Sequence, residues 1–392
     1  MAETEMQEAA RLAKERYEHK DEYSPMMQHY ISTKVKYADC ILLYRLGDFF
    51  EMFFEDAKMV ARDLELTLTG KDCGQDKRAP MCGIPHHAVD SYISRLVQKG
   101  YKVAICEQLE DPSKAKGIVK RDVIKIVTPG TQVDGSSIED KRNNFIMSIY
   151  KEGTFFGVAV CDISTGDFYA TEIREDNNFS KLIDEISRFN PSEIIVNKMM
   201  GESKEEIKEI RARFDCYITF EKDIKDDEEN PSEAENLELE SGENLSHKKD
   251  KVANVSKDAY AVISKNKSHW GNDIYIFSND PKYIKEQFEI TSESGENIDI
   301  TKKMFAVCAI NGLMNYIEET QKQIPENLNK ITFYEVTKYM TLDINARKNL
   351  EITERMRDKS KRGTLLWVLD KTSTAMRRKT FKKMGKWSAN WC

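Results

Sequence analysis

The stretch at residues 47–54, "GDFFEMFF", sets Glu51 among four phenylalanines and a methionine. Before it, "CILLYRL" (residues 40–46) is a short apolar run that predicts a buried strand. After it, hydrophobic residues recur with the 3.6-residue period of a helix. We therefore expect a helix from Phe50, with Asp48 and Glu51 at the spacing of a capping box, and with an apolar face formed by Phe50, Phe53, Phe54, Ala57, Val60, Ala61 and Leu64.

The apolar face of this expected helix leaves two residues of the stretch unused, Phe49 and Glu51. If the backbone is extended at this junction, the side chains at 49 and 51 point to one side and that of Phe50 to the other. Phe49 and Glu51 are then candidates for a binding site. The alternative is structural: Phe49 lies at the rim of the core, and Glu51 only caps the helix. The spacing alone leaves both interpretations open.

Strand and helix patterns alternate along most of the chain. Residues 66–70 predict a strand, residues 88–99 a helix and residues 101–106 another strand. Residues 143–220 continue the alternation with further strands and a helix, and from about residue 299 the pattern becomes helical. The sequence therefore predicts the α/β fold class for two successive units, followed by helices.

The composition is that of an ordinary globular protein. The 392 residues are 40% hydrophobic, 9% aromatic and 32% charged, which favours two or three domains. No apolar run reaches the roughly 18 residues of a transmembrane helix, and the charged N-terminus lacks the apolar region of a secretory signal. Eight scattered cysteines without close pairing indicate reduced thiols rather than a disulfide framework.

The net charge of −7 is concentrated in one segment. Residues 221–244 hold eleven acidic residues and two lysines, so the rest of the chain carries a net charge of +2. Residues 302–392 hold 19 Lys and Arg against 9 Asp and Glu. Solvated helix faces would explain such basic residues, but the distribution also remains compatible with binding a polyanion.

Motifs for catalysis are weak in this sequence. It contains neither the glycine-rich loop of P-loop nucleotide-binding proteins nor the G-x-S-x-G motif of serine hydrolases. Cys82, His86 and His87 form a cluster without the partner pair that a zinc site needs, so a packed loop is favoured there. Asp162, at the end of a predicted strand, is a candidate nuclease carboxylate without converging acids around it.

Long stretches of the chain resemble the MutS family of bacterial DNA mismatch repair proteins. The resemblance covers essentially residues 24–376 apart from the acidic segment, and its most specific parts are "SPMMQHYISTKVKYADCILLYRLGDFFEMFFEDA", "APMCGIPHHAVDSYISRLVQKGYKVAICEQL", "FFGVAVCDISTGDF", "LDINARKNLEIT" and "GTLLWVLDKTSTAM". In this family a Phe-x-Glu motif reads the mispair, and it corresponds here to Phe49-Phe50-Glu51. The family usually has tyrosine in the middle, so Phe50 keeps the ring and loses the hydroxyl.

The resemblance implies separate roles for the two outer residues of the motif. Phe49 would be the wedge that stacks on the mispaired base from the minor groove, and Glu51 would be the hydrogen-bonding partner of that base. From their charge alone, Lys71, Lys77 and Arg78 are candidate contacts to the DNA backbone.

The resemblance and the residue patterns together predict the order of domains. We expect an N-terminal helix (1–20), a mixed-sheet mismatch-recognition domain (21–115), a linker (116–134), an α/β, RNase H-like connector domain (135–295) with an acidic disordered insertion (221–258), the start of an all-α core domain (296–376) and an aberrant tail (377–392). The tail departs from the family pattern, which suggests a frame disruption or a truncated gene model.

The family also implies partners, cofactors and location. Its full-length members bind double-stranded DNA with mismatches or small loops, act as homodimers with a MutL-like partner, and work in the bacterial cytoplasm at the nucleoid, not at a membrane. They use ATP and Mg²⁺ at a site outside these residues, so we expect no catalytic residue, metal site or cofactor in this chain. The clamp and dimer contacts also fall outside it, so weak or absent specific DNA binding is expected for the isolated chain.

Two other functions remain open from the sequence. Residues 135–295 could act only as a docking module for a MutL-like partner, without specific DNA binding. A nuclease built on the second unit would instead require metal-dependent cleavage that Asp162→Asn abolishes.

Overall fold

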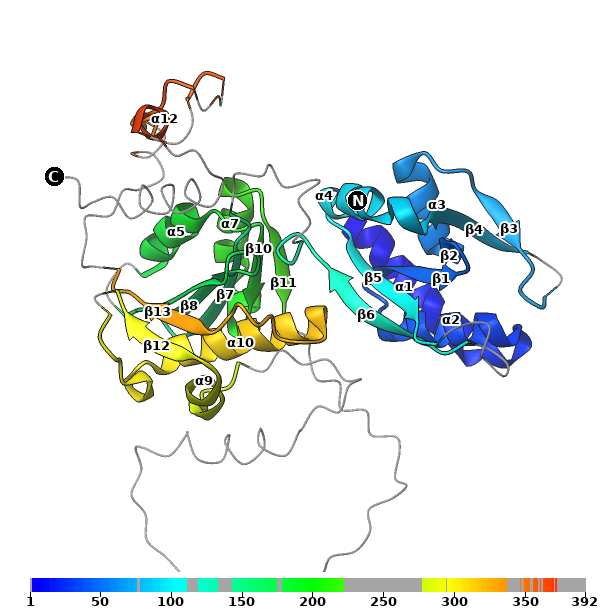
Figure 1. Ribbon diagram of the computed structural model, residues 1–392, viewed down its shortest axis with the longest axis horizontal. Coiled ribbons are helices and arrows are strands. Elements are labelled where there is room, and N and C mark those ends of the chain that lie inside the picture. Colours follow the sequence, from blue (N-terminus) through cyan, green and yellow to red (C-terminus); the bar gives the residue numbers. More distant parts are fainter. Residues whose placement is uncertain are drawn as a thin grey trace, which may run out of the picture. The chain divides into compact units, whose positions relative to one another are not determined.

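The computed structural model describes most of the chain as two β-sheets with helices on their faces (Figure 1). Residues 222–258 of the expected acidic insertion and the tail at 377–392 lie outside the described residues. The described residues are 2–75, 78–110, 119–132, 143–174, 178–221, 277–293, 295–336 and, with short gaps, 346–371.

The first sheet, sheet A, is mixed. Its strand order is β3-β4-β2-β1-β5-β6, in which only β1 and β5 run parallel. The strands are β1 (Cys40–Leu46), β2 (Phe49–Phe53), β3 (Thr69–Lys71), β4 (Ala79–Pro85), β5 (Lys102–Gln108) and β6 (Arg121–Val127). The last strand, β6, lies within the expected linker (116–134) and pairs with β5, so this part of the linker completes the sheet.

Helices cover both faces of sheet A. On one face, α3 (Phe54–Leu64) and α4 (Val89–Gln98) bury their apolar sides against Phe50 and Met52 of β2. On the other face, α2 (Pro25–Lys36) packs against Phe53. The N-terminal helix α1 (Ala2–Glu18) contacts α2 and adds Ala9 to the first of these cores.

The helix that the sequence predicted from Phe50 begins instead at Phe54, so the prediction of a capping box at Asp48 and Glu51 is wrong. The reason is that β2 pairs with β1 on one side and with β4 on the other, which holds residues 49–53 extended. Phe54, with φ of 54°, makes the turn from strand to helix. A bulky residue in this left-handed region is strained, and its neighbours must hold it there.

The second sheet, sheet B, contains seven described strands. Their order is β11-β10-β7-β8-β9-β13-β12. The strands are β7 (Ile146–Glu152), β8 (Phe155–Asp162), β9 (Asp167–Ile173), β10 (Glu193–Val196), β11 (Tyr217–Phe220), β12 (Glu289–Ser292) and β13 (Lys330–Phe333). Only the β7-β8 and β8-β9 pairs are antiparallel.

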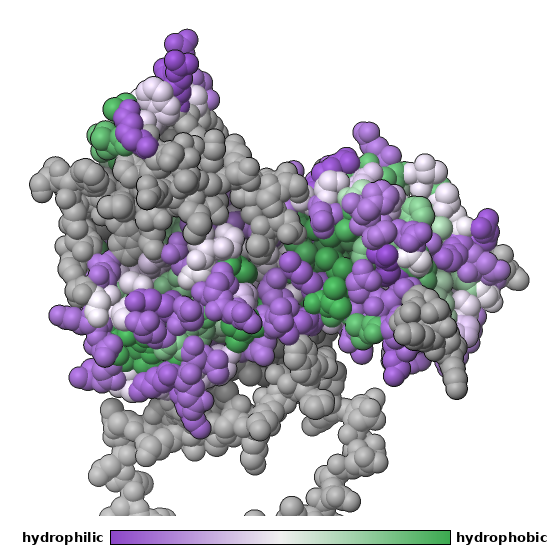
Figure 2. Space-filling view, in the orientation of Figure 1, coloured by the Kyte–Doolittle hydropathy of each residue, from purple (hydrophilic) through white to green (hydrophobic). Residues whose placement is uncertain are grey.

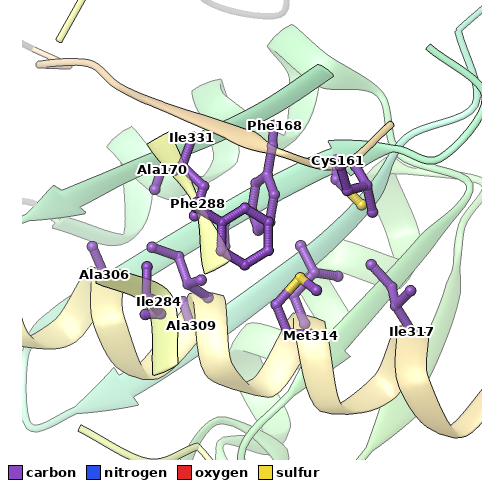
Figure 3. Close-up of a cluster of buried hydrophobic side chains, with 14 of the residues drawn as sticks. Cys161, Phe168, Ala170, Ile284, Phe288, Ala306, Ala309, Met314, Ile317 and Ile331 are labelled. Atoms are coloured by element: carbon purple, nitrogen blue, oxygen red, sulfur yellow. The ribbon is translucent and has the colours of Figure 1, made fainter. Parts of the chain in front are cut away.

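Sheet B also has a core on each face. One core lies against α5 (Asn178–Phe189), α6 (Lys198–Glu202) and α7 (Lys204–Arg213), and the other against α9 (Lys282–Gln287) and α10 (Met304–Gln321). Figure 3 shows the second core, where the rings of Phe168 and Phe288 meet edge to face at 5.8 Å between sheet and helix. Such buried aromatic pairs supply much of the apolar area that stabilises a core.

The structure moves the end of the second unit beyond the expected boundary at residue 296. Helix α10 packs along β7 and β8, and β13 pairs with β9 and β12, so neither begins a separate helical domain. Gly157 permits the close approach, because a Cβ at this position would lie 1.8 Å from the carbonyl oxygen of Phe305 in α10. A helix that is apolar nearly all round, as α10 is, suits burial against a sheet as well as burial in a bundle.

A buried carboxylate, Glu193 of β10, joins the turn after β6 to sheet B. It accepts hydrogen bonds from the Thr128 hydroxyl at 2.6 Å and the Gly130 amide at 3.1 Å. It also accepts from the hydroxyls of Thr219 at 2.7 Å and Tyr316 at 2.5 Å. Because four donors converge on it, the charge is satisfied without contact with solvent.

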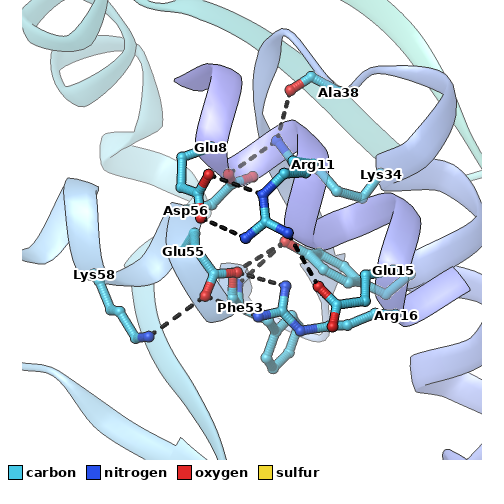
Figure 4. A network of polar contacts seen from close by, with 11 residues as sticks. Glu8, Arg11, Glu15, Arg16, Lys34, Ala38, Phe53, Glu55, Asp56 and Lys58 are labelled. Atoms are coloured by element: carbon cyan, nitrogen blue, oxygen red, sulfur yellow. Dashed lines mark hydrogen bonds and ion pairs between the residues drawn. The ribbon is translucent and has the colours of Figure 1, made fainter. Parts of the chain in front are cut away.

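A second buried carboxylate, Asp56 of α3, ties α2 to sheet A. Its Oδ1 lies 2.9 Å from the Lys34 ammonium (Figure 4). Its Oδ2 accepts from the Leu42 amide at 3.0 Å. Burial raises the pKa of Asp56 even though Lys34 acts in the opposite direction. Arg16 of α1 pairs with Glu55 at 2.5 Å and lies over the Phe54 ring at 4.3 Å, so α1 holds the strained junction from outside.

Among the described residues, no helix is both long enough and apolar enough to cross a membrane.

We expect Lys34→Met to lower the free energy of unfolding by about 3–5 kcal/mol near pH 7, because Asp56 would be left charged, buried and without its partner. The loss should shrink as the pH falls. Burial has already raised the pKa of Asp56, so acid protonates this carboxyl and removes the unpaired charge. Urea unfolding followed by circular dichroism at several pH values measures both effects.

Lys58→Met provides the matched control for this prediction. Lys58 also pairs with an acid, Glu55, at 3.4 Å, but its side chain is exposed. Its loss should change the free energy of unfolding by less than about 0.5 kcal/mol. Equal effects of the two substitutions would contradict the importance of the buried pair.

Candidate functional site

The side chains of strand β2 alternate between the two faces of sheet A. Phe50 and Met52 are buried in the core under α3 and α4. Phe49 is 46% exposed, and the side chain of Glu51, on the same face of the sheet, retains 15% of its accessible surface. The extended interpretation of residues 49–51 is therefore the one that the structure adopts, and Glu51 does not cap the following helix.

Gly83 of β4 lies beside both residues. It is opposite Glu51 in the antiparallel register, and a Cβ added to it would lie 3.7 Å from the Phe49 ring and 3.7 Å from Cγ of Glu51. Because glycine has no side chain, the Phe49 ring and the Glu51 stem flank an open strip of backbone. Sequence reasoning did not select Gly83, since its position next to the motif depends on the pairing of β2 with β4.

Glu51 is held by Lys71 of the edge strand β3. The Lys71 ammonium donates to Oε2 of Glu51 at 2.6 Å and lies 5.7 Å from the centre of the Phe53 ring. Lys71 retains 32% of its side-chain surface, so the pair is shielded but reaches solvent. Charge-assisted hydrogen bonds are shorter and stronger than neutral ones, but the partial exposure of Lys71 limits what this pair contributes to stability. The structure therefore gives Lys71 a partner that the sequence did not predict.

Of the other two basic candidates for DNA backbone contacts, the structure describes Arg78 but not Lys77. Arg78 is exposed, and its Cβ lies 3.2 Å from the position that a Cβ on Gly70 would occupy. It thus stands beside β3, directly before Ala79, the residue of β4 that pairs with Lys71. Lys77 lies outside the described residues.

The turn that presents Phe49 is anchored by its own carbonyl groups. Gly47, with φ of 58°, accepts at its carbonyl from Arg45 Nε at 2.6 Å. The Asp48 carbonyl accepts from the His86 amide at 2.9 Å. These bonds fix the start of β2, where Phe49 stands. Arg45 was not selected from the sequence, because a single arginine at the end of a strand carries no motif.

The neighbour of Glu51 on the other side, Tyr44 of β1, is an uncharged group. Its hydroxyl lies 2.9 Å from Nδ1 of His29, and burial raises the pKa of Tyr44 to about 12. Burial also lowers the pKa of His29 below its ordinary value. Both groups are therefore neutral near pH 7, and they add no charge next to the Glu51–Lys71 pair.

Exposure by itself does not select Phe49, since other hydrophobic side chains are also exposed. Ile124 of β6 is one, and Figure 2 shows hydrophobic residues gathered over this edge strand. What distinguishes Phe49 is an aromatic ring beside a carboxylate and a lysine on one sheet face. Such a ring can stack on a planar base, and the carboxylate can accept a hydrogen bond from the edge of that base.

The remaining candidates from the sequence have structural roles. Cys82 is buried and donates to the Ala57 carbonyl, whereas His86 and His87 are exposed, and the described residues contain no group of three or more metal-ligating side chains. Asp162 is fully buried and accepts from the amide and hydroxyl of Ser164, a turn-forming pattern.

Comparison with known proteins matches most of this chain to one family. Models of "MutS domain I" and "MutS domain II" match residues 24–136 and 144–257. The chain is 45% identical over 361 residues to "DNA mismatch repair protein MutS" of Ruminiclostridium cellulolyticum and 46% identical over 361 residues to the protein of the same name in Clostridium novyi. These alignments cover 92% of this chain but 35% and 33% of the relatives, so the chain spans about a third of their length. The chain belongs to the MutS family of DNA mismatch repair proteins.

Proposed function

We propose that this chain recognises mispaired double-stranded DNA through sheet A, with Phe49 entering the duplex and Glu51 contacting the displaced base. The observation that carries the proposal is the exposed Phe49 ring, held next to a carboxylate by a strand whose other face is pinned in the core. Family membership supports the same assignment. The roles of Phe49 as the wedge and of Glu51 as the partner of the displaced base are part of this proposal.

The energetics favour a mispair over a matched pair. Inserting a ring at a base step and kinking the duplex costs a few kcal/mol, and base–aromatic stacking returns about 1–3 kcal/mol. A mispaired base is already poorly stacked and paired, so it is opened at lower cost. The same bend is therefore cheaper at a lesion, which allows one site to accept many kinds of mismatch or small loop.

The alignments span about a third of the length of the relatives. We propose that the clamp, the homodimer contacts and the ATPase site, with its ATP and Mg²⁺, belong to parts of the relatives that this chain does not span. We assign no catalytic residue to the described chain. Binding through sheet A of a single copy should be weak, so an assay at low ionic strength is needed, where backbone contacts contribute most.

We expect Phe49→Ala to abolish the unstacking of a mispaired base. The probe is a duplex with 2-aminopurine, whose fluorescence rises when it unstacks, beside a G·T mismatch, at about 50 mM salt. The unaltered chain should raise the fluorescence of this duplex and leave that of the matched duplex nearly unchanged. Phe155→Ala is the control, since Phe155 is also exposed but lies in sheet B. A rise that persists without the Phe49 ring would refute the wedge.

Arg78→Gln tests the remaining described backbone candidate. If Arg78 contacts a phosphate, its loss should weaken binding to matched and mismatched duplexes alike and reduce the slope of log K against log salt by about one. Fluorescence anisotropy over a series of salt concentrations gives the slope. An unchanged slope rejects the contact.

A second candidate function is docking of a MutL-like partner by sheet B. The observation that favours it is an exposed aromatic stack: Phe155 lies on Phe305 at 5.5 Å, and the Arg174 guanidinium lies over Phe305 at 4.9 Å. Aromatic residues with arginine are typical of the energetic centres of protein interfaces.

Phe155→Ala combined with Arg174→Ala should then reduce capture of a MutL-like protein at least tenfold, because both anchors of the stack are lost. The 2-aminopurine signal on mismatched DNA should stay unchanged. Loss of the DNA signal with retained capture would contradict this division of roles between the sheets.

A further inference from the structure

The Glu51 carboxylate already has a partner in the DNA-free chain. Its Oε2 accepts from the Lys71 ammonium at 2.6 Å, and only 15% of its side-chain surface remains accessible. The Lys71 ammonium partly neutralises this carboxylate and occupies one of its two oxygens, so a base that bonds to Glu51 competes with Lys71 for it.

We propose that Lys71 is a specificity-determining residue that exchanges partners when the chain meets a mispair. In the free chain Lys71 holds Glu51; at a mispair its ammonium moves to a backbone phosphate, and Glu51 is released to the displaced base. This inference rests on the proposed function of sheet A in mismatch recognition.

The chemistry of Lys71 suits such an exchange. Its ammonium is a compact charge with three donors on a flexible four-carbon stem, and it can turn to a second anion without a fixed geometry. It retains 32% of its side-chain surface and stands on β3, at the edge of sheet A. A partly exposed ion pair contributes modestly to stability, so a phosphate can compete for the lysine.

The exchange links affinity to the state of the base. At a matched step no displaced base edge is available, and departure of Lys71 would leave Glu51 charged, half-enclosed and unpaired beside the phosphates. Lys71 then remains with Glu51, and the phosphate contact is not made. At a mispair the displaced base replaces Lys71 as the partner of Glu51, so the phosphate contact is added to the base contact.

The first experiment tests the pair without DNA. Competitive labelling of lysine amines, read by mass spectrometry, reports how accessible and nucleophilic each ammonium group is. Glu51→Gln should raise the labelling rate of Lys71 several-fold and leave that of Lys58, which pairs with Glu55 of α3, unchanged. An unchanged rate at Lys71 would show that Glu51 does not hold it in solution and would overturn the proposal.

The second experiment measures the exchange itself. For the unaltered chain, the slope of log K against log salt should be larger by about one for the G·T duplex than for the matched duplex, because the mispair gains one phosphate contact. Lys71→Met should remove this difference and reduce the preference for the mispair. Lys71→Arg, which keeps the charge, should retain both, and Lys58→Met should change neither.

A comparison of backgrounds completes the test. In the unaltered chain Lys71 must break its pair with Glu51 before it contacts a phosphate, whereas in the Glu51→Gln chain it need not. Lys71→Met should therefore weaken mispair binding about fivefold more in the Glu51→Gln chain than in the unaltered chain. An equal slope reduction on both duplexes would make Lys71 an ordinary backbone contact, and no reduction on either would make it a structural partner of Glu51. Either result overturns the exchange while mismatch preference remains. If the unaltered chain showed no preference for the mismatched duplex, and Phe49→Ala had no effect on binding, the proposed function would be overturned as well.

Discussion

The two-residue period of strand β2 is the constraint on which the site depends. Hydrogen bonding to β1 and β4 keeps the strand extended, and the burial of Phe50 and Met52 fixes which face each side chain takes. A shift of one residue would bury Phe49 and expose Phe50, at the cost of the core under α3. Burial of Phe50 and Met52 turns Phe49 to the other face of the sheet, where α2 covers Phe53 but leaves Phe49 46% exposed.

The site is assembled across three adjacent strands rather than along one segment. Phe49 and Glu51 come from β2, Gly83 from β4 and Lys71 from β3. The sheet sets the distances between them, because neighbouring strands lie about 4.8 Å apart and side chains alternate in step. Sites built on strands in this way are positioned more exactly than sites on loops, which suits a reader of small differences in base geometry.

Much of this arrangement was predictable from the sequence, and the failures have physical causes. The alternation at 49–51 and the α/β class follow from hydrophobic periodicity, and the helix expected at residues 88–99 is α4. The helix was placed too early because Phe50 and Phe53, three residues apart, fit one face of a helix. In the structure they lie on opposite faces of β2, and both are buried because helices cover both faces of the sheet. The packing of α10 against sheet B was not predicted, because a helix that is apolar nearly all round can pack against a sheet or within a helical bundle. The Lys71–Glu51 contact could not be predicted from the sequence, because it depends on the registers in which β4 pairs with β2 on one side and with β3 on the other.

The position of Lys71 on β3 has a consequence for motion. This strand has three residues and pairs only with β4, so it belongs to the part of the sheet that opens locally at the smallest free energy. Amide hydrogens there should exchange with solvent far sooner than those of β1 at the centre. Local opening of β3 would move Lys71 away from Glu51 while β2 keeps its pairing with β1.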